Sequence, residues 1–193
     1  MIQIINAFIN FITQNPIELY GEFGLQHELS LFLRQNYPEL TVRLEYPTSR
    51  LGFNPLPNFI KKEIDIYVRN ENGESCVIEL KMPKDNCGTP NEMYSAIKDV
   101  KFLEELKNAG IDYCFSILFT DRRAFWQAKQ ANAGIYNFFN GVSVNIQTLK
   151  FIHMPNFLHR RGTINIIHNH QSHWQNYTDS ENKNWKYYII EIP

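Results

Sequence analysis

The sequence predicts an α/β fold with a mixed central sheet, formed by a single domain over residues 1–193. Two N-terminal helical segments precede a β-hairpin with an Asn-Gly turn, and a capped helix then leads into an apolar strand and further strand-like runs. The composition, 44% hydrophobic and 20% charged, is that of an ordinary globular protein. No repeat or low-complexity linker divides the chain, so we expect one domain.

The N-terminal segment, residues 1–15, is apolar with a helical period, and its apolar face is formed by Ile2, Ile5, Phe8, Ile9 and Ile12. The segment contains no Lys or Arg, which favours an amphipathic helix packed on the core over a secretory signal peptide. A second helix is expected from Ile17 to Gln35, begun by Pro16 and ended by Pro38.

Charge and cysteine content limit the classes of function. The 19 Lys and Arg residues and the 20 Asp and Glu residues give a net charge of −1, so any anion-binding surface must be local. The three cysteines, Cys76, Cys87 and Cys114, form no C-x-x-C motif, which argues against a disulfide framework and a thiolate zinc site. A reducing, cytoplasmic location is therefore expected, and no segment predicts a transmembrane span.

A β-hairpin is expected in the first half of the chain. Residues from Lys62 to Val68 alternate between polar and apolar, Asn72-Gly73 is a strong turn signal, and Ser75 to Met82 returns as the partner strand. The preceding loop, from Pro47 to Asn58, is rich in turn-forming residues and is either a ligand-facing segment or a long connection.

The second half of the chain is expected to begin with a helix from Thr89 to Asn108. Thr89 is its expected N-cap, with Pro90 at the first helical position and Glu92 completing a capping box. The apolar run from Tyr113 to Thr120 predicts a buried strand. The segments expected after it are a short helix capped by Asp121 that carries Phe125 and Trp126, and strands at Val142–Leu149, Thr163–His168 and Trp185–Ile192.

Three ionisable residues of the hairpin are candidate catalytic groups. Side chains alternate between the faces of a strand, so Glu79 and Lys81 share one face, and the tight turn brings Asp65 of the partner strand close to Glu79. Two carboxylates and the main-chain carbonyl of Leu80 form an all-oxygen site suited to Mg²⁺, for which Mn²⁺ can substitute. A lysine beside such a site can orient water or stabilise a charged transition state. The alternative is that these residues form ordinary ion pairs on a solvated sheet face.

Glu28 is expected to contribute a further carboxylate. An unpaired carboxylate among apolar side chains is costly, and helical geometry surrounds Glu28 with Gly24, Leu25, Leu31 and Phe32. Glu22 has the polar residues Glu18 and Gln26 at the corresponding positions and is expected to be solvated. The alternative for Glu28 is a side chain that reaches solvent at the edge of the apolar stripe.

These residues together resemble the PD-(D/E)XK, or restriction-endonuclease-like, nuclease superfamily. The shared pattern is a helix bearing Glu, then Asp, then Glu-x-Lys across a hairpin, followed by a helix and a strand. The resemblance implies an αβββαβ core, here with an extra N-terminal helix and C-terminal strands. It implies that Asp65, Glu79 and Lys81 are the catalytic triad and that Glu28 assists metal binding. Ile64 stands where the proline that names the motif would be.

Further segments resemble a narrower, poorly characterised group within the superfamily. They are Ala96–Val100 through Leu103-Glu104, Leu118–Asp121 with Phe125-Trp126, and Trp174–Tyr177 with Tyr187–Ile192. Membership of the superfamily implies Mg²⁺-dependent hydrolysis of phosphodiester bonds, usually in DNA, and leaves open whether the substrate is a specific site, a branched structure or an end.

Several basic residues and one histidine tract carry weaker expectations. The residues that could contact a nucleic-acid backbone are Lys61, Lys62, Arg122, Arg123, Arg160 and Arg161. The compact tract His168-x-His170-x-x-His173 favours a polar turn over a metal cluster.

We therefore expect a cytoplasmic, Mg²⁺-dependent endonuclease of the restriction or DNA-processing type. A homodimer is expected because two-fold symmetry presents one active site to each strand of a duplex. The alternative is a catalytically inactive nucleic-acid-binding or interaction module with the same fold, in a defence or mobile-element system. The near-neutral charge slightly favours this module, whereas the complete triad favours the nuclease.

Overall fold

The computed structural model describes residues 1–83, 88–127, 135–140, 148–149 and 162–193. Its helices are α1 (Ile2–Gln14), α2 (Glu22–Asn36), α3 (Thr89–Asn108) and α4 (Tyr136–Phe139), with 3₁₀ turns η1 (Thr48–Arg50) and η2 (Arg123–Phe125). Its strands are β1 (Thr41–Pro47), β2 (Glu63–Arg69), β3 (Ser75–Lys81), β4 (Tyr113–Thr120), β5 (Thr148–Leu149), β6 (Ile164–Asn165), β7 (Gln175–Thr178) and β8 (Asn184–Glu191).

Within the described residues, six strands form the central sheet, in the order β1-β2-β3-β4-β8-β7. β3 and β4 are parallel and every other neighbouring pair is antiparallel, so the predicted mixed α/β architecture is confirmed. The parallel pair lies in the middle of the sheet, where both strands are almost entirely buried, and α3 connects them as the crossover helix.

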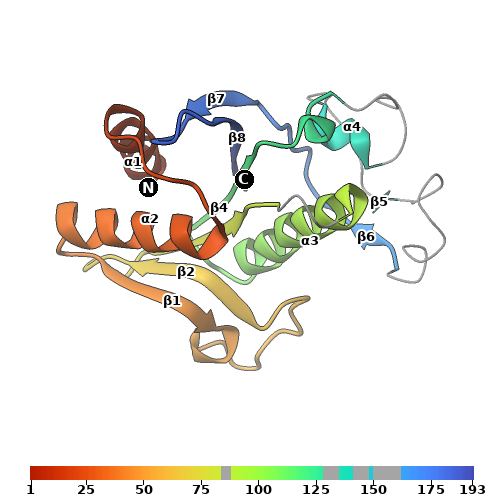
Figure 1. The fold of residues 1–193 in the computed structure, drawn as a ribbon. Helices are drawn as coiled ribbons and strands as arrows, with labels where there is room; N and C mark the ends of the chain where they lie inside the picture. Colours follow the sequence, from red (N-terminus) through yellow and green to blue (C-terminus); the bar gives the residue numbers. More distant parts are fainter. Residues whose placement is uncertain (84–87, 128–134, 141–147, 150–161) are drawn as a thin grey trace.

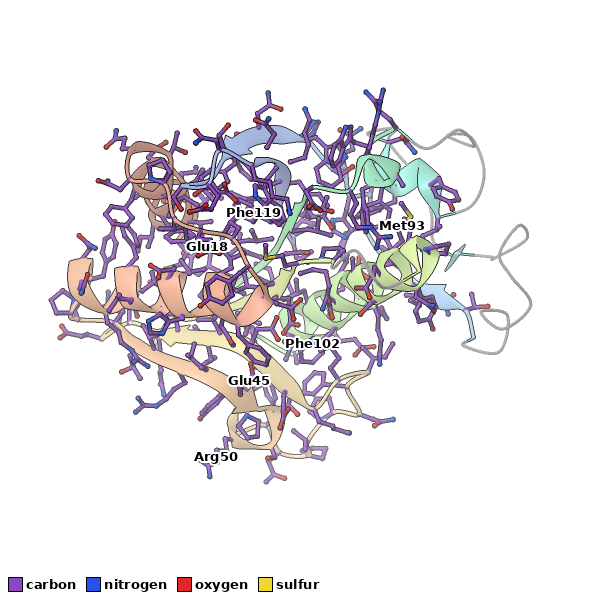
Figure 2. All side chains as sticks on the ribbon, viewed as in Figure 1. Glu18, Glu45, Arg50, Met93, Phe102 and Phe119 are labelled. Atoms are coloured by element: carbon purple, nitrogen blue, oxygen red, sulfur yellow. The ribbon has the colours of Figure 1, made fainter. Side chains whose placement is uncertain are left out.

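Helices cover both faces of this sheet (Figure 1). α1 and α2 lie on one face, where the core includes Ile78 of β3 and Phe119 of β4. α3 lies on the opposite face, where Met93 and Phe102 pack in one core with Val77 of β3 (Figure 2). Val77 and Ile78 belong to different cores because successive side chains of a strand point to opposite faces.

The predicted hairpin is confirmed, with β2 antiparallel to β3 and Ile66 opposite Ile78. Gly73 in the turn has a φ of 88°, in the left-handed region that favours glycine. β1, which the sequence analysis did not assign, pairs with the other edge of β2. The chain therefore runs helix, strand, strand, strand, helix, strand from α2 to β4.

The second helix starts later than expected, and this difference affects the candidate site. α2 begins at Glu22 rather than at Ile17. The hydroxyl of Tyr177 on β7 accepts a hydrogen bond from the amide of Ile17 at 3.0 Å and donates to its carbonyl at 3.1 Å. Because both backbone groups of Ile17 are bonded to another element, the segment before Glu22 crosses the sheet edge instead of forming a helical turn.

Helix caps and C-terminal strands also differ in detail. Gly88 and not Thr89 is the N-cap of α3, because the Thr89 hydroxyl accepts a hydrogen bond from Arg122 at 2.8 Å. The short helix after β4 is the single turn η2, and Asp121 forms an ion pair with Lys183 instead of capping it. β8 matches the last predicted strand within one residue at each end, and most of the run predicted at Val142–Leu149 lies outside the described residues.

Among the described residues, no helix combines the length and the apolar character needed to cross a membrane.

Candidate active site

The register of the hairpin brings Asp65 and Glu79 together. Asp65 Oδ2 accepts a hydrogen bond from the backbone amide of Leu80 at 2.7 Å, and the Asp65 amide lies 3.4 Å from Glu79 Oε1. Glu79 is 1% exposed although β3 is a central strand with apolar residues on both faces. Each of the two carboxylates therefore faces a backbone amide of the neighbouring strand. Burial at this position makes a negative charge on either carboxylate costly.

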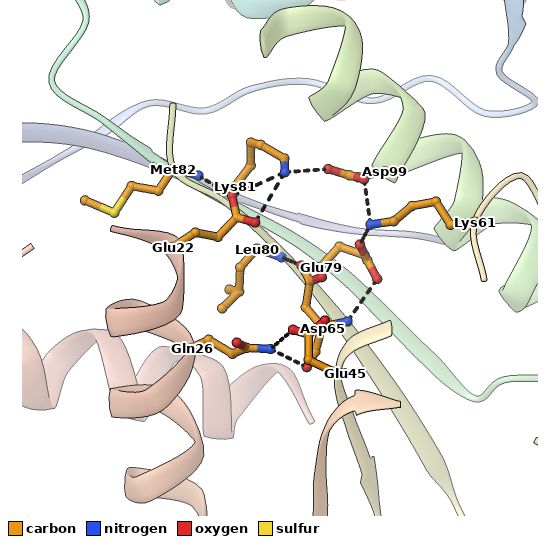
Figure 3. A network of polar contacts seen from close by, with 10 residues as sticks. All are labelled: Glu22, Gln26, Glu45, Lys61, Asp65, Glu79, Leu80, Lys81, Met82 and Asp99. Carbon is orange, nitrogen blue, oxygen red and sulfur yellow. Dashed lines mark hydrogen bonds and ion pairs between the residues drawn. The ribbon is translucent and has the colours of Figure 1, made fainter. Parts of the chain in front are cut away.

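Lys81 follows Glu79 on the same face of β3 and points toward α3 and the start of α2 (Figure 3). Its ammonium lies 3.5 Å from Asp99 Oδ2 and 3.2 Å from Glu22 Oε2. Glu22 also accepts a hydrogen bond from the backbone amide of Met82 at 3.1 Å. Lys81 is thus held from two sides, by a carboxylate of each helix that packs on the sheet.

Lys61 enters the same cluster from the loop before β2. Its Nζ is hydrogen-bonded to Glu79 Oε2 and lies 2.9 Å from Asp99 Oδ1, and it stands 5.5 Å from the centre of the Phe102 ring. From the sequence, Lys61 was expected to contact a nucleic-acid backbone. In the structure its charge instead bridges two buried carboxylates, one on β3 and one on α3.

The helix carboxylate at the cluster is Glu22 and not Glu28, which corrects the sequence expectation. Gln26 is buried and faces the sheet, and Glu28 lies two residues farther, about 200° around the helix axis. The described part of the chain offers Glu28 no hydrogen bond or ion pair. Glu22 was assigned to solvent because Glu18 was taken as a helical neighbour, whereas α2 starts only at Glu22.

A small hollow of about 80 Å³ opens beside Asp65. Glu22, Gln26, Glu45 and Leu80 contribute to its lining. Gln26 Nε2 donates to the Asp65 carbonyl and to Glu45 Oε1, each at 2.7 Å. Glu45 has a φ of 47°, a conformation that a non-glycine residue adopts at a cost. The residue with this strained backbone thus directs its carboxylate at Gln26, near the start of α2.

Burial and mutual repulsion perturb the carboxylates of the cluster. Burial raises the pKa of Asp65 to about 6, although the charge of Lys61 and the hydrogen bond from Leu80 oppose the rise. Burial, and then the nearby charge of Asp65, raise the pKa of Glu79 well above its usual range. The pKa of Lys81 is also raised: burial alone would lower it, but Asp99 and Glu22 outweigh that effect. Perturbed carboxylates beside a cationic lysine are typical of functional sites.

The donor set of the cluster fits a hard divalent cation in its chemistry. All its acidic groups are oxygen donors. With every group ionised, the four carboxylates and two ammonium groups carry a formal charge of −2; the carboxylates are Glu22, Asp65, Glu79 and Asp99, and the ammonium groups are Lys61 and Lys81. Asp99 Oδ2 is buried and accepts no hydrogen bond. Within the described residues no three His, Cys, Asp or Glu side chains form a ready metal-binding group. The ammonium of Lys61 lies between Glu79 and Asp99, so a cation bound there would have to displace it or share its carboxylates.

The other expected contact residues lie away from this cluster or outside the described chain. Lys62 and Arg123 are exposed, whereas Arg122 donates to the Thr89 hydroxyl at the start of α3. Arg160 and Arg161 lie outside the described residues. The tract expected as a polar turn contains the buried His170, whose Nε2 lies 3.0 Å from Glu104 Oε1.

Asp99 and Glu22 are the cluster members that were not selected from the sequence, and Lys61 was selected only as a contact for a nucleic-acid backbone. Asp99 carried a usable signal, because Ala96, Phe102 and Leu103 surround it on α3 as apolar residues. This is the pattern that drew attention to Glu28. Lys61 lies in a loop without periodicity, and no sequence pattern indicates which way its side chain points.

Comparisons of the chain with protein-family models, with curated proteins and with solved structures found no match. The function of the cluster is therefore inferred from its own chemistry.

Proposed function

We propose that the protein is a Mg²⁺-dependent nuclease that hydrolyses phosphodiester bonds, with DNA as the first substrate to test. The observation that carries the proposal is the convergence of Asp65, Glu79 and Lys81 on neighbouring strands, with the Leu80 amide bonded to Asp65 at 2.7 Å. The helix-strand-strand-strand-helix-strand order from α2 to β4 agrees with the restriction-endonuclease-like core that the sequence resembles, and we propose that core for this chain.

Each group of the cluster has a role in this reaction. Asp65, Glu79 and the Leu80 carbonyl would hold Mg²⁺, which supplies Lewis-acid polarisation of a phosphate oxygen when it is bound. Lys81 would place its ammonium beside the attacking water and the phosphate, where it stabilises the charge that develops in the transition state. Glu22 and Asp99 act on Lys81, because both carboxylates fix the position of its Nζ.

The direct test is incubation of the purified protein with supercoiled plasmid, linear duplex and single-stranded DNA, and RNA. We expect cleavage with Mg²⁺ or Mn²⁺, binding with little cleavage in Ca²⁺, and no requirement for zinc, because the cluster as described contains only carboxylate and ammonium groups. If both strands of a duplex are cut, we expect light scattering to show a homodimer. Cleavage that persists in excess EDTA would contradict the proposed chemistry.

One observation favours a second candidate function. The Lys61 ammonium already neutralises Glu79 and Asp99 from within the chain, as an internal cation would. An inactive nucleic-acid-binding module would have this property, because it would need no metal to stabilise the buried carboxylates. Binding of DNA by both wild type and Lys61→Ala without turnover in any metal would support this candidate over the nuclease.

The corrected assignment of the helix carboxylate yields a matched pair of variants on α2. Glu22→Gln removes a charge that lies 3.2 Å from Lys81, so we expect cleavage to fall about 10-fold or more. Glu28→Gln is expected to leave cleavage within about 2-fold of wild type, because Glu28 makes no described polar contact. Initial rates of plasmid nicking measure both. A larger loss of cleavage rate in Glu28→Gln than in Glu22→Gln would show that Glu28 is the helix carboxylate of the site.

A further inference from the structure

Two aromatic side chains stand exposed at the start of α2, beside the acidic cluster. Phe23 is 77% exposed and Tyr20 is 71% exposed, the highest values for large hydrophobic side chains in the described part of the chain. They flank Glu22, the carboxylate that holds Lys81. Most exposed apolar residues occur singly and need no partner, but these two line the same hollow beside a polar cluster.

The rings border a series of neighbouring hollows, the last of which lies beside the cluster. A hollow of about 330 Å³ is lined by Tyr20, Phe23 and Met82 among others. It adjoins the hollow of about 80 Å³ beside Asp65, because Glu22 and Phe23 line both. On the other side it adjoins a hollow of about 160 Å³, which shares Tyr20 and Met82 with it and ends at a lysine and a tryptophan.

The ring of Tyr20 packs on the backbone of α2 at Gly24. A Cβ added at Gly24 would lie 2.9 Å from Cζ of Tyr20 and 3.2 Å from both neighbouring ring carbons, so the ring packs against the bare backbone of the helix. The absence of a side chain at position 24 thus lets the tyrosine ring lie on α2 while most of its surface remains open to solvent. A ring held in this way loses little further entropy when a ligand stacks on it.

The far end of the series carries a positive charge beside another ring. Lys183 Nζ stands 4.4 Å from the centre of the Trp185 ring and is paired with Asp121. The hollows therefore run from the carboxylates of Glu22, Glu45 and Asp65, past the two open rings, to Lys183 beside the buried ring of Trp185. Two open rings beside a site proposed to act on phosphodiester bonds suit a nucleic-acid strand whose bases are unpaired.

We propose that Tyr20 and Phe23 stack on unpaired bases, so that the nucleic acid bound at this site is single-stranded, as in a free strand, a flap or a frayed end. The proposal deepens the nuclease function above and depends on it for the identity of the ligand. Bases in a duplex hide their faces in the helical stack, and only unpaired bases can cover an open ring. A net charge of −1 also fits a protein that gains affinity from stacking more than from many phosphate contacts.

The experiment measures binding, separately from cleavage. Wild-type protein in Ca²⁺ buffer is titrated into a fluorescein-labelled 20-nucleotide oligo(dT) and into a blunt 20-base-pair duplex, with fluorescence anisotropy as the readout. We expect tighter binding of the single strand. Tyr20→Ala and Phe23→Ala should each weaken it by about 5- to 150-fold, the range for loss of one base–aromatic stack.

Three further variants separate stacking from other causes. Phe23→Trp keeps a stacking surface and should bind oligo(dT) within about 2-fold of wild type, with tryptophan fluorescence quenched on binding. Gly24→Ala keeps both rings but displaces the ring of Tyr20 from the backbone of α2, so it should weaken binding of the single strand and not of the duplex. Leu31→Ala removes a partly exposed apolar side chain from the same helix and should change neither.

The outcomes distinguish this proposal from the proposed nuclease function. Ring-dependent preference for the single strand without cleavage in Mg²⁺ would contradict the nuclease and retain the stacking surface. Cleavage with wild-type oligo(dT) affinity in Tyr20→Ala and Phe23→Ala would retain the nuclease and overturn the stacking. A protein that binds neither probe would also overturn it.

Discussion

Asp65→Asn and Glu79→Gln should each abolish detectable cleavage, a loss of at least about 100-fold. Asp65→Asn should do so without lowering the stability of the protein, whereas Glu79→Gln also removes the charge that pairs with Lys61. Both substitutions keep the size of the side chain and an oxygen that can accept the hydrogen bonds at the hairpin, including the one from the Leu80 amide. They remove a negative charge that is buried and repelled by its neighbour, which is why the pKa values of both carboxyls are raised. A site that costs stability for the sake of function has this behaviour.

The stability side of this prediction depends on pH, with a sign that follows from the pKa of Asp65. Burial raises this pKa from 3.8 to about 6, so between these values the folded protein binds more protons than the unfolded chain. The contribution of Asp65 to the free energy of unfolding therefore falls as pH rises from about 4 to about 6. Asp65→Asn should lose this fall, so its advantage over wild type should grow across that interval.

Urea unfolding at several pH values, paired with plasmid nicking at neutral pH, measures both sides of the prediction. Glu63→Gln is the matched control, because Glu63 is an exposed carboxylate on the same strand as Asp65. It should change neither rate nor stability appreciably. Cleavage at the wild-type rate by both Asp65→Asn and Glu79→Gln would show that the catalytic site does not lie on this hairpin.

Local sequence patterns predicted those elements in which the burial of the side chains and the turn residues at the ends indicate the same structure. The apolar run from Tyr113 to Thr120 became β4 with the predicted ends, because a central strand is buried on both faces and turn residues bound it. The same reasoning was available for β1, since Thr41 to Tyr46 alternates polar and apolar. Its strained residue Glu45 interrupts the pairing with β2 and points toward α2, which no propensity indicates.

The errors in the candidate site arose from contacts between distant segments. The start of α2 was misplaced because Ile17 is bonded to Tyr177, 160 residues farther along the chain, and this moved the expected helix carboxylate from Glu22 to Glu28. Lys61 was expected to contact a nucleic-acid backbone because it lies just upstream of Asp65, whereas two buried carboxylates hold its ammonium. Asp65, Glu79 and Lys81 were brought together as expected from strand alternation and a two-strand register.

The second large effect is expected on the free energy of unfolding, from substitution of Glu104. This residue lies on the side of α3 opposite to Asp99. Its carboxylate is 1% exposed and accepts hydrogen bonds from the backbone amides of Ile167 and His168, each at 2.8 Å at the closest, while Nε2 of His170 lies 3.0 Å away. One side chain of α3 thus holds the segment that follows β6, and these bonds explain why β6 is shorter than predicted.

Glu104→Ala should lower the free energy of unfolding by about 3–5 kcal/mol, because it leaves buried donors without an acceptor. Glu104→Gln keeps an acceptor and should cost less. Burial alone would raise the pKa of Glu104, but the bonds from His170, His168 and Ile167 outweigh it and the pKa is lowered.

A lowered carboxyl pKa fixes the direction of the pH effect at Glu104. The unfolded chain binds more protons than the folded protein just below the usual range of a Glu, so the contribution of Glu104 is present at neutral pH and is lost as pH falls through its folded pKa. Wild type should therefore lose stability on acidification more steeply than Glu104→Gln.

Urea unfolding from pH 7 to pH 3 measures the slopes, and amide hydrogen exchange at Ile167 and His168 shows whether the segment detaches. Glu71→Ala, at an exposed turn position, is the control and should leave both unchanged. Exchange rates in Glu104→Ala equal to wild type would show that other contacts hold this segment to α3.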